Sequence, residues 1–242
     1  MKILILGGTA EARELANRLV AEGHEVISSL AGRTQEPRLP QGGLRMGKFG
    51  GIPGLCAYLR AAGIERMVDA THPYAGQISI NAVAAAQITG VPLLRYMRPP
   101  WEQQIGDDWI TVETAAEAAA ALPRNSEVLL TTGHTGLEHF LERDDCRFVV
   151  RTIEAPAVEL PAHARLLQAR PPYSFDSEMA LMQREGITHL VTKNSGGPQT
   201  ESKLEAARRL GVKVIMIARP AYGPATEVSS IEAAIAALGE AR

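Results

Sequence analysis

The chain begins with an uninterrupted apolar run, Ile3–Leu6, that ends in the glycine pair Gly7 and Gly8. Such a run is typical of a strand that is buried on both faces of a parallel sheet. A helical pattern follows over residues 11–23, where apolar side chains recur every three or four positions. A second strand is predicted over residues 25–30. The resulting βαβ unit is the start of a nucleotide-binding α/β domain.

Strands and helices continue to alternate along the chain. The consecutive prolines within Arg98–Trp101 interrupt this pattern, because they can continue neither a helix nor a central strand. We therefore predict an α/β fold of two Rossmann-like parallel-sheet domains, with the active-site cleft between them. The domains are expected at residues 1–98, which would bind the nucleotide, and 99–242, which would bind substrate. This boundary is approximate, and the pattern is compatible with an exchange of strands between the halves. Further strands are predicted at residues 66–70, 92–95, 127–132, 147–153, 165–168, 189–192 and 213–217.

Composition excludes several classes of function. The formal net charge is −2, so no general positive field attracts nucleic acid or an anionic membrane surface. No apolar run approaches the length of a membrane span, and no secretory signal is recognisable. Cys56 and Cys146 form no metal-binding motif, and His134 and His139 are too poorly spaced to share a metal. We expect a cytoplasmic, monomeric protein that binds no metal.

The turn after the first strand is a candidate phosphate-binding site. It comprises Gly7, Gly8, Thr9, Ala10 and Glu11 and leads directly into the predicted helix. Backbone amides and the helix dipole at such a position favour a diphosphate. Compared with the G-x-G-x-x-G/A fingerprint, Thr9 replaces the second glycine, and its hydroxyl could bond phosphate directly. The alternative is a plain strand-to-helix turn.

The end of the second predicted strand indicates which nicotinamide cofactor is used. Dinucleotide sites specific for NAD usually have an acidic residue there, but this chain has Ser28, Ser29 and, shortly after, Arg33. Ser29 and Arg33 could hold a 2'-phosphate through charge-assisted hydrogen bonds, which favours NADPH. A solvated surface arginine is the alternative interpretation of Arg33.

A third loop, Asp69–Ala75, follows another buried strand. Pro73 stiffens its backbone, and Thr71 and His72 are expected to face the cofactor. His72 could protonate a substrate, since the ordinary pKa of histidine lies near neutral pH. A hydrogen-bonded structural role for His72 is an equal alternative.

Two loops in the second half are candidate anion sites. Residues 131–136 and 192–197 each lie between a strand and a helix and are rich in glycine and hydroxyl groups. Lys193 adds a positive charge to the second loop, and Arg95, Arg98 and Arg151 could add others. Such spacing suits a ligand with many carboxylates. The candidate substrate-binding residues are Arg95, Thr132, Gly133, Lys193, Asn194, Ser195, Gly196 and Gly197.

Several segments together resemble the precorrin-6A and cobalt-precorrin-6A reductase family of cobalamin biosynthesis. They occur in the family's order over nearly the whole chain, and the pair DATHPYA and TKNSGG is the most specific. The segments are ILILGGTAEARELA, SLAGR, DATHPYA, PPYSFDSE, THLVTKNSGG and KLEAARRLGVKVIMIARP.

This resemblance implies that the protein reduces one double bond of precorrin-6A, or of its cobalt complex, to the 6B form with NADPH. The substrate would be a tetrapyrrole edged with acetates and propionates. By this resemblance Gly7–Glu11, Ser29, Arg33 and Thr71–Pro73 hold the cofactor, whereas Lys193, Ser195, Gly196 and the region of Arg95 hold substrate carboxylates. His72 and Tyr74 are the candidate proton donors, together with water.

Two other functions fit the sequence less well. A short-chain dehydrogenase requires a Tyr-x-x-x-Lys pair, but no tyrosine in this chain has a lysine four residues later. A non-catalytic NADP(H)-sensing module would share the first domain but would have little need of the anion loops in the second. The reductase is therefore the favoured interpretation.

Overall fold

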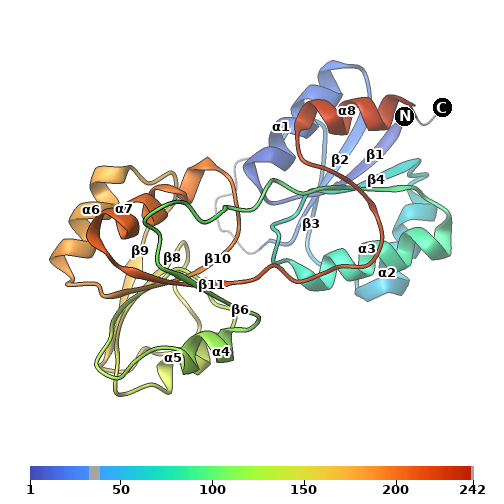
Figure 1. Cartoon of the computed structure of the whole chain (residues 1–242). Helices are drawn as coiled ribbons and strands as arrows, with labels where there is room; N and C mark the ends of the chain where they lie inside the picture. The colour runs from blue at the N-terminus through green and yellow to red at the C-terminus, as the bar shows by residue number, and fades with distance from the viewer. Residues whose placement is uncertain (33–38, 241–242) are drawn as a thin grey trace. The chain divides into compact units, whose positions relative to one another are not determined.

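The computed structural model describes residues 1–32 and 39–240 and divides into two α/β units (Figure 1). The first unit comprises Met1–Pro99 and Pro220–Arg242, and the second comprises Pro100–Arg219. Each unit is built on a six-stranded sheet in which all the paired strands are parallel. The predicted fold class, two Rossmann-like parallel sheets, is thereby confirmed. No helix in the described ranges is long and apolar enough to cross a membrane.

The sheet of the first unit has the strand order β3-β2-β1-β4-β5-β12. This is the order of a dinucleotide-binding Rossmann sheet, in which the chain reverses its direction of winding between the first and fourth strands. The open edge for a ligand therefore lies at the carboxyl ends of β1 and β4. The strands are β1 (Lys2–Leu6), β2 (Glu25–Leu30), β3 (Gly43–Met46), β4 (Arg66–Asp69), β5 (Leu93–Tyr96) and β12 (Thr226–Val228).

Helices cover both faces of this sheet (Figure 1). On one face, α1 (Ala10–Ala21) and α8 (Ile231–Glu240) pack side by side over β1, β2 and β5. On the other, α2 (Gly51–Ala61) and α3 (Gly76–Thr89) pack over a second apolar cluster. Apolar residues recur every three or four positions along α1 and form one face of the helix, on which Leu15 and Leu19 are fully buried.

The end of the chain returns to the first unit. β12 pairs with β5, so that Thr226 lies opposite Leu94, and α8 buries Ile231, Ala234 and Leu238 against α1 and the sheet. The expected assignment of residues 220–242 to the second domain is therefore wrong. The reason is apolar burial: α8 completes a core that the first 99 residues leave uncovered.

The second unit has the strand order β9-β8-β7-β10-β11-β6, with its reversal between β7 and β10. Helices α6 and α7 lie on one face of the sheet and α4 and α5 on the other (Figure 1). The strands are β6 (Trp109–Val112), β7 (Glu127–Leu130), β8 (Arg147–Thr152), β9 (Ala164–Gln168), β10 (His189–Lys193) and β11 (Lys213–Ile217). The helices are α4 (Ala115–Ala120), α5 (Leu137–Leu141), α6 (Phe175–Arg184), the 3-10 turn η1 (Pro198–Thr200) and α7 (Ser202–Leu210).

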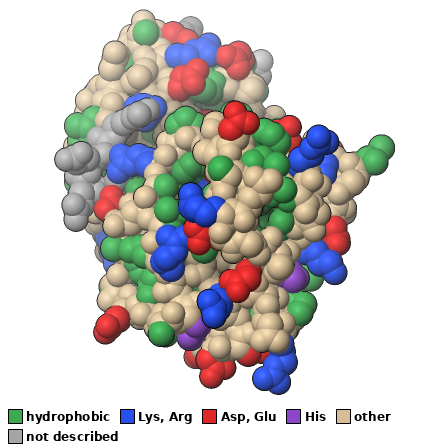
Figure 2. Space-filling model, turned by 90° about the vertical axis from the view of Figure 1, so that its left-hand side faces the viewer, with side chains coloured by type: hydrophobic (Ala, Val, Ile, Leu, Met, Phe, Trp, Pro, Cys, Tyr) green, Lys and Arg blue, Asp and Glu red, His purple; other side chains and the backbone are tan. Residues whose placement is uncertain are grey.

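On the face drawn in Figure 2, lysine and arginine side chains are interspersed with aspartate and glutamate. Neither sign of charge gathers into one large area on that face. This distribution agrees with the formal net charge of −2 and offers no basic stripe of the kind that tracks a nucleic-acid backbone.

Candidate functional site

The glycine turn between β1 and α1 leaves the amino end of the helix open. Gly7 donates its amide to the Ser29 carbonyl at 3.0 Å, which holds the turn against the end of β2. Gly8 has φ +118°, and apart from its chain neighbours no atom of the described residues lies within 4 Å of where its Cβ would be. Only glycine adopts this conformation readily, and the empty space lets a ligand approach the backbone. The turn thus fits a diphosphate at the amino end of α1.

Thr9 joins this turn to the end of β4. Its Oγ1 accepts a hydrogen bond from the Ala12 amide at 3.0 Å, which caps α1, and donates to the Ala70 carbonyl at 2.9 Å. The single hydroxyl proton is therefore already used within the protein. In this conformation Thr9 positions the turn rather than donating its side-chain proton to phosphate.

The loop after β4 is held by a buried carboxylate. Asp69 is 2 % exposed, and its Oδ1 accepts from the Thr71 hydroxyl at 2.7 Å and from the Thr71 amide at 3.3 Å. From the returning end of the chain, Tyr222 donates its hydroxyl to the Pro73 carbonyl at 2.7 Å. Burial raises the pKa of Tyr222, with the negative charge of Asp69 as a smaller cause. Both ends of this loop are consequently fixed.

The two candidate proton donors lie together on this loop. His72 is exposed, its Nδ1 accepts from the Tyr74 amide at 3.2 Å, and the two rings are 5.8 Å apart. Because Nδ1 accepts, a neutral His72 ring carries its proton on Nε2. The geometry thus presents an N–H of His72 next to the Tyr74 ring.

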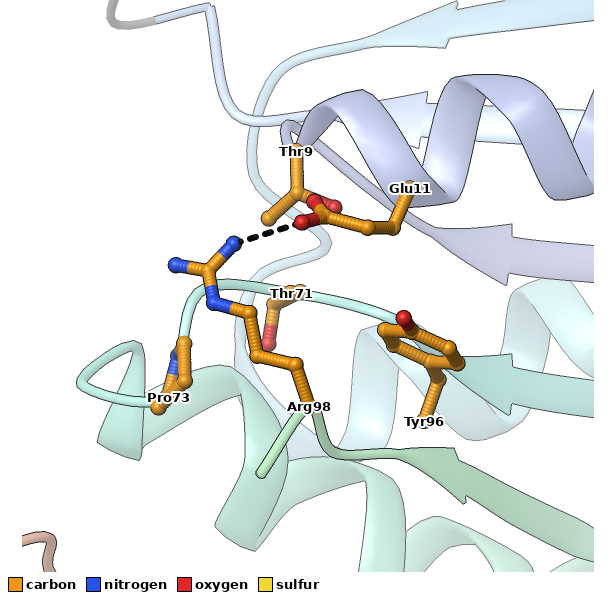
Figure 3. Close-up of a pocket in the computed structure, with 6 residues that line it drawn as sticks. All are labelled: Thr9, Glu11, Thr71, Pro73, Tyr96 and Arg98. Carbon is orange, nitrogen blue, oxygen red and sulfur yellow. Dashed lines mark hydrogen bonds and ion pairs between the residues drawn. The ribbon is translucent and has the colours of Figure 1, made fainter. Parts of the chain in front are cut away.

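A pocket lies at the carboxyl ends of β1, β4 and β5 (Figure 3). Its most polar feature is an ion pair in which Arg98 Nη1 lies 3.0 Å from Glu11 Oε1. Burial raises the pKa of Tyr96, and the charge of Glu11 raises it further. Sequence reasoning missed Tyr96, although its place at the end of a strand beside β4 was a usable signal. The pocket is lined by Thr9, Glu11, Thr71, Pro73, Tyr96 and Arg98.

Of the two residues predicted to bind the 2'-phosphate, Ser29 is buried near the end of β2, and Arg33 lies outside the described residues. Arg45 on β3, which sequence reasoning missed, lies opposite Ser29, with Nη1 3.4 Å from its Oγ. Its guanidinium also donates to the Gly47 and Lys48 carbonyls and stacks on the Phe49 ring at 3.7 Å. A positive charge is thus fixed beside Ser29.

Arg95 is in the interior of the first unit. Its side chain is 2 % exposed, its Nε lies 3.6 Å from Asp69 Oδ2, and its Nη1 lies 3.0 Å from Glu227 Oε1. The same Nη1 donates to the carbonyls of Tyr222 and Gly223. Arg95 therefore links β4 to residues 222–227 in the interior of the first unit and does not lie at a surface that could face substrate.

In the second unit, the strand order brings the two predicted anion loops to neighbouring strand ends. β7 pairs with β10, and beyond β7 the Thr131 amide and hydroxyl both donate to the Val191 carbonyl, at 2.9 and 3.1 Å. Thr132 is buried, and its Oγ1 has no hydrogen-bond partner among the described residues. Gly133 follows with φ +72°. The Thr132–Gly133 turn and the loop after β10 thus lie at the same edge of the sheet.

Within the loop after β10, Asn194 is committed to the backbone. Its Oδ1 accepts from the Trp101 amide at 2.8 Å, its Nδ2 donates to the Trp101 carbonyl at 3.0 Å, and its own carbonyl accepts from Arg219 Nε at 2.7 Å. Asn194 therefore ties together the two ends of the second unit. Lys193, the last residue of β10, precedes it, and Ser195, Gly196 and Gly197 follow it in the loop.

The described residues contain no cluster of three or more His, Cys, Asp and Glu side chains that could hold a metal ion. His134 Nε2 instead lies 2.8 Å from the Glu154 carbonyl.

Comparison with known proteins assigns the family. The family model described as Precorrin-6x reductase CbiJ/CobK matches residues 2–239. The precorrin-6A reductase of Rhodococcus erythropolis is 47% identical over 98% of this chain and 97% of its own, and the cobalt-precorrin-6A reductase of Priestia megaterium is 31% identical over 98% and 97%. A solved structure of CobK precorrin-6A reductase superimposes with a TM-score of 0.92 and 40% identity, covering 99% of this chain and 96% of that one. The chain belongs to the precorrin-6x reductase family.

Proposed function

We propose that the protein uses NADPH to reduce one double bond of precorrin-6A to the 6B form in cobalamin biosynthesis. The observation that carries the proposal is the glycine turn at the β1/β4 edge, in a chain that matches the reductase family from residue 2 to residue 239. A Rossmann sheet binds its dinucleotide at this edge. The family relationship supplies the reaction that the bound cofactor serves.

In the proposed complex the diphosphate lies against the amides of Gly8, Ala10 and Glu11. Thr9 and Asp69 hold the turn and the Thr71 loop in place through the bonds described above. A nicotinamide cofactor supplies the hydride when it is bound. The task of the protein is then to orient the cofactor against the acceptor carbon and to exclude water.

The proposed preference for NADPH rests on the end of β2. No acidic residue occurs from Ser28 to Arg33, and Arg45 fixes a positive charge next to Ser29. Arg33 is the proposed direct partner of the 2'-phosphate. Arg33→Ala should therefore weaken NADPH binding roughly 10-fold to 100-fold, the loss of a charge-assisted hydrogen bond, and leave NADH binding almost unchanged. An equal loss for both cofactors contradicts this role.

The proposed substrate site lies in the second unit. Thr132, Gly133, Lys193, Ser195 and Gly196 would bind carboxylates of the tetrapyrrole with backbone amides, hydroxyls and one ammonium. Arg95 and Asn194 are left out as direct contacts, because their side chains are already bonded within the protein. The higher identity with the relative named for precorrin-6A, 47% against 31%, favours the metal-free substrate.

Reduction by a hydride also requires one proton. His72 is the favoured donor, since it is an exposed residue whose neutral ring would carry the proton on Nε2, and Tyr74 next to it is the second candidate. His72→Asn and Tyr74→Phe separate the two residues, because loss of the group that donates the proton should lower kcat. NADPH affinity should stay unchanged in Tyr74→Phe, whereas His72→Asn could also weaken NADPH binding because His72 belongs to the proposed cofactor site. Unchanged kcat in both variants would point to water.

The proposal is tested by anaerobic incubation of the purified protein with precorrin-6A and NADPH or NADH. We expect NADPH oxidation to match, mole for mole, the formation of a product two hydrogens heavier, with much slower turnover on NADH. Cobalt-precorrin-6A, supplied in parallel, tests the metal preference. Tight NADPH binding without turnover of either substrate would support a sensing module, and no NADPH binding would refute the proposed cofactor.

A further inference from the structure

The Glu11–Arg98 ion pair lies at the end of α1 where the cofactor diphosphate is proposed to bind. Glu11 is the second residue of α1 and lines the same pocket as the capping residue Thr9 (Figure 3). Arg98 lies just after β5, next to Pro99, where the first stretch of the first unit ends, and its side chain pairs with Glu11. The two side chains are 18 and 17 % exposed, so the pair is partly shielded but still open to the pocket. Both charges therefore lie where an anionic ligand would meet them.

A carboxylate at this position has two opposite effects. It stabilises the empty helix terminus, because negative charge is favourable at the amino end of a helix. It also repels a diphosphate bound to the same amides, since like charges a few ångströms apart disfavour each other. In the absence of a ligand Arg98 neutralises Glu11. The ion pair thus competes with the diphosphate for the same arginine.

We propose that Arg98 is an exchangeable counter-ion: it leaves Glu11 when the cofactor binds and donates to the cofactor diphosphate instead. This inference rests on the proposed NADPH site. The exchange is favourable because guanidinium binds phosphate oxygens in a bidentate manner, whereas a partly exposed ion pair contributes little. No other arginine or lysine lines this pocket in the described part of the chain. Glu11 lowers the affinity for the cofactor, and Arg98 raises it.

The proposal predicts effects of opposite sign for two substitutions that break the same ion pair. Arg98→Met should weaken NADPH binding roughly 10-fold or more, because a charge-assisted contact is lost. Glu11→Gln should strengthen it about 3-fold to 10-fold, because both the competitor and the repulsion are removed. Titration calorimetry measures both. Arg98→Lys keeps the charge but not the bidentate geometry and should lose less affinity than Arg98→Met.

Cofactor fragments locate the effect. 2'-Phospho-ADP-ribose contains the diphosphate and should respond to both substitutions as NADPH does, whereas adenosine 2'-monophosphate lacks it and should change less than about 2-fold. In the double variant Glu11→Gln with Arg98→Met, the gain in NADPH affinity from Glu11→Gln should be smaller, because no arginine remains for Glu11 to release. Glu14→Gln and Arg18→Met, on the same helix but outside the pair, serve as charge-matched controls that leave affinity nearly unchanged.

Three results would overturn the inference. If both substitutions weaken NADPH, the ion pair is a structural support of the site. If adenosine 2'-monophosphate is affected equally, the change is not at the diphosphate. If Glu11→Gln gives its full gain in the Arg98→Met background, Glu11 acts by repulsion alone and Arg98 does not exchange. Failure of the wild-type protein to bind NADPH refutes the proposed function instead, so the two failures are distinguishable.

Discussion

Among the residues that the structure describes, each unit contains one buried arginine, but only the arginine of the first unit has partners far along the chain. Arg95, on β5 of the first unit, bonds to residues 127 to 132 positions away, in the returning segment. Arg151, on β8 of the second unit, pairs with Glu178 only 27 positions away and lies 4.1 Å from the centre of the Tyr173 ring. The first unit is thus closed by the end of the chain, and the second by its own neighbouring segments.

The difference bears directly on function. The Arg95 cluster includes Asp69 and Tyr222, which hold the two ends of the Thr71–Pro73 loop. The Arg151 cluster holds the segment before α6, where Tyr173 donates to the Ala169 carbonyl. Damage to the two clusters should therefore cost similar stability but affect different ligands.

The largest expected effect tests this comparison directly. Arg95→Met leaves Asp69 buried without its ion pair, and Arg151→Met does the same to Glu178. Each should lower the free energy of unfolding by about 3–5 kcal/mol, the usual cost of an uncompensated buried charge. Only Arg95→Met should also weaken NADPH binding. Urea unfolding and NADPH titration measure the two effects.

Two double variants control for the loss of charge balance: Arg95→Met with Asp69→Asn, and Arg151→Met with Glu178→Met. Both should regain much of the lost stability, because the buried carboxylate is gone. Equal NADPH affinities in Arg95→Met and the wild-type protein would show that the first cluster does not position the cofactor loop.

A second prediction compares the two glycine turns. Gly8→Ala places an alanine at φ +118°, a strained conformation, and adds a methyl group where phosphate would approach. NADPH binding should weaken roughly 10-fold to 100-fold, with the substrate KM unchanged. Gly133→Ala, at φ +72°, should instead raise the substrate KM, about 5-fold to 10-fold, without changing NADPH affinity. Reversed effects would mean that the two ligands are assigned to the wrong units.

Two tyrosines, Tyr222, which is buried, and Tyr173, which is half-buried, allow a comparison with a smaller expected effect. Tyr222→Phe and Tyr173→Phe each remove a hydroxyl that donates to a backbone carbonyl, at 2.7 and 2.8 Å. Each should cost about 1–2 kcal/mol of stability. Tyr222→Phe should also weaken NADPH severalfold, because the Pro73 carbonyl loses its partner, whereas Tyr173→Phe should not.

The pH dependence checks the same pair. Burial raises the pKa of both tyrosines above their ordinary value of 10.0, so folding favours the neutral hydroxyl. Their contribution is complete below pH 10 and is lost as the pH rises toward the folded-state pKa. Urea unfolding near neutral pH and at about pH 11 should therefore show a smaller alkaline loss in each phenylalanine variant than in the wild-type protein. An identical loss would mean that neither hydroxyl is perturbed by burial.

The central strands were predictable because strands buried on both faces form continuous apolar runs. β1 and β11 illustrate this, since all but their first residues are buried. The strands that sequence reasoning missed, β3, β6 and β12, each lie at an edge of their sheet and have largely exposed residues. Helix α8 was also missed, although Ile231, Ala234 and Leu238 recur at helical spacing. The three missed strands are short, and their apolar pattern is too weak to predict a strand. The longer edge strand β9 was predicted, at residues 165–168.

The loops of the candidate site were predictable for a topological reason: residues that follow parallel strands gather at one edge of the sheet. What the side chains do there was not. Arg95 and Asn194 were predicted to face a ligand because of their positions at strand ends. Their side chains instead bond to segments far along the chain. Arg45 was missed because its neighbour Ser29 lies on a different strand. Such pairings depend on strand register across the sheet, which local sequence does not encode.

The smallest expected effect concerns how α8 is attached. Arg18 on α1 and Glu232 on α8 form an exposed ion pair at 2.6 Å, and the hydrogen bond from Arg18 lowers the pKa of Glu232. Its contribution is therefore present above the ordinary glutamate pKa and is lost as the pH falls through the lower pKa of the folded state. Glu232→Gln should lower Tm by less than about 2 °C at pH 7, and by progressively less as the pH is lowered below the ordinary glutamate pKa. Thermal unfolding of both proteins measures this. The effect should be small because Ile231 and Leu238 are buried and Arg95 bonds to the segment before them. A larger decrease in Tm would mean that the ion pair, rather than the apolar core and the Arg95 hydrogen bonds, attaches the end of the chain to the first unit.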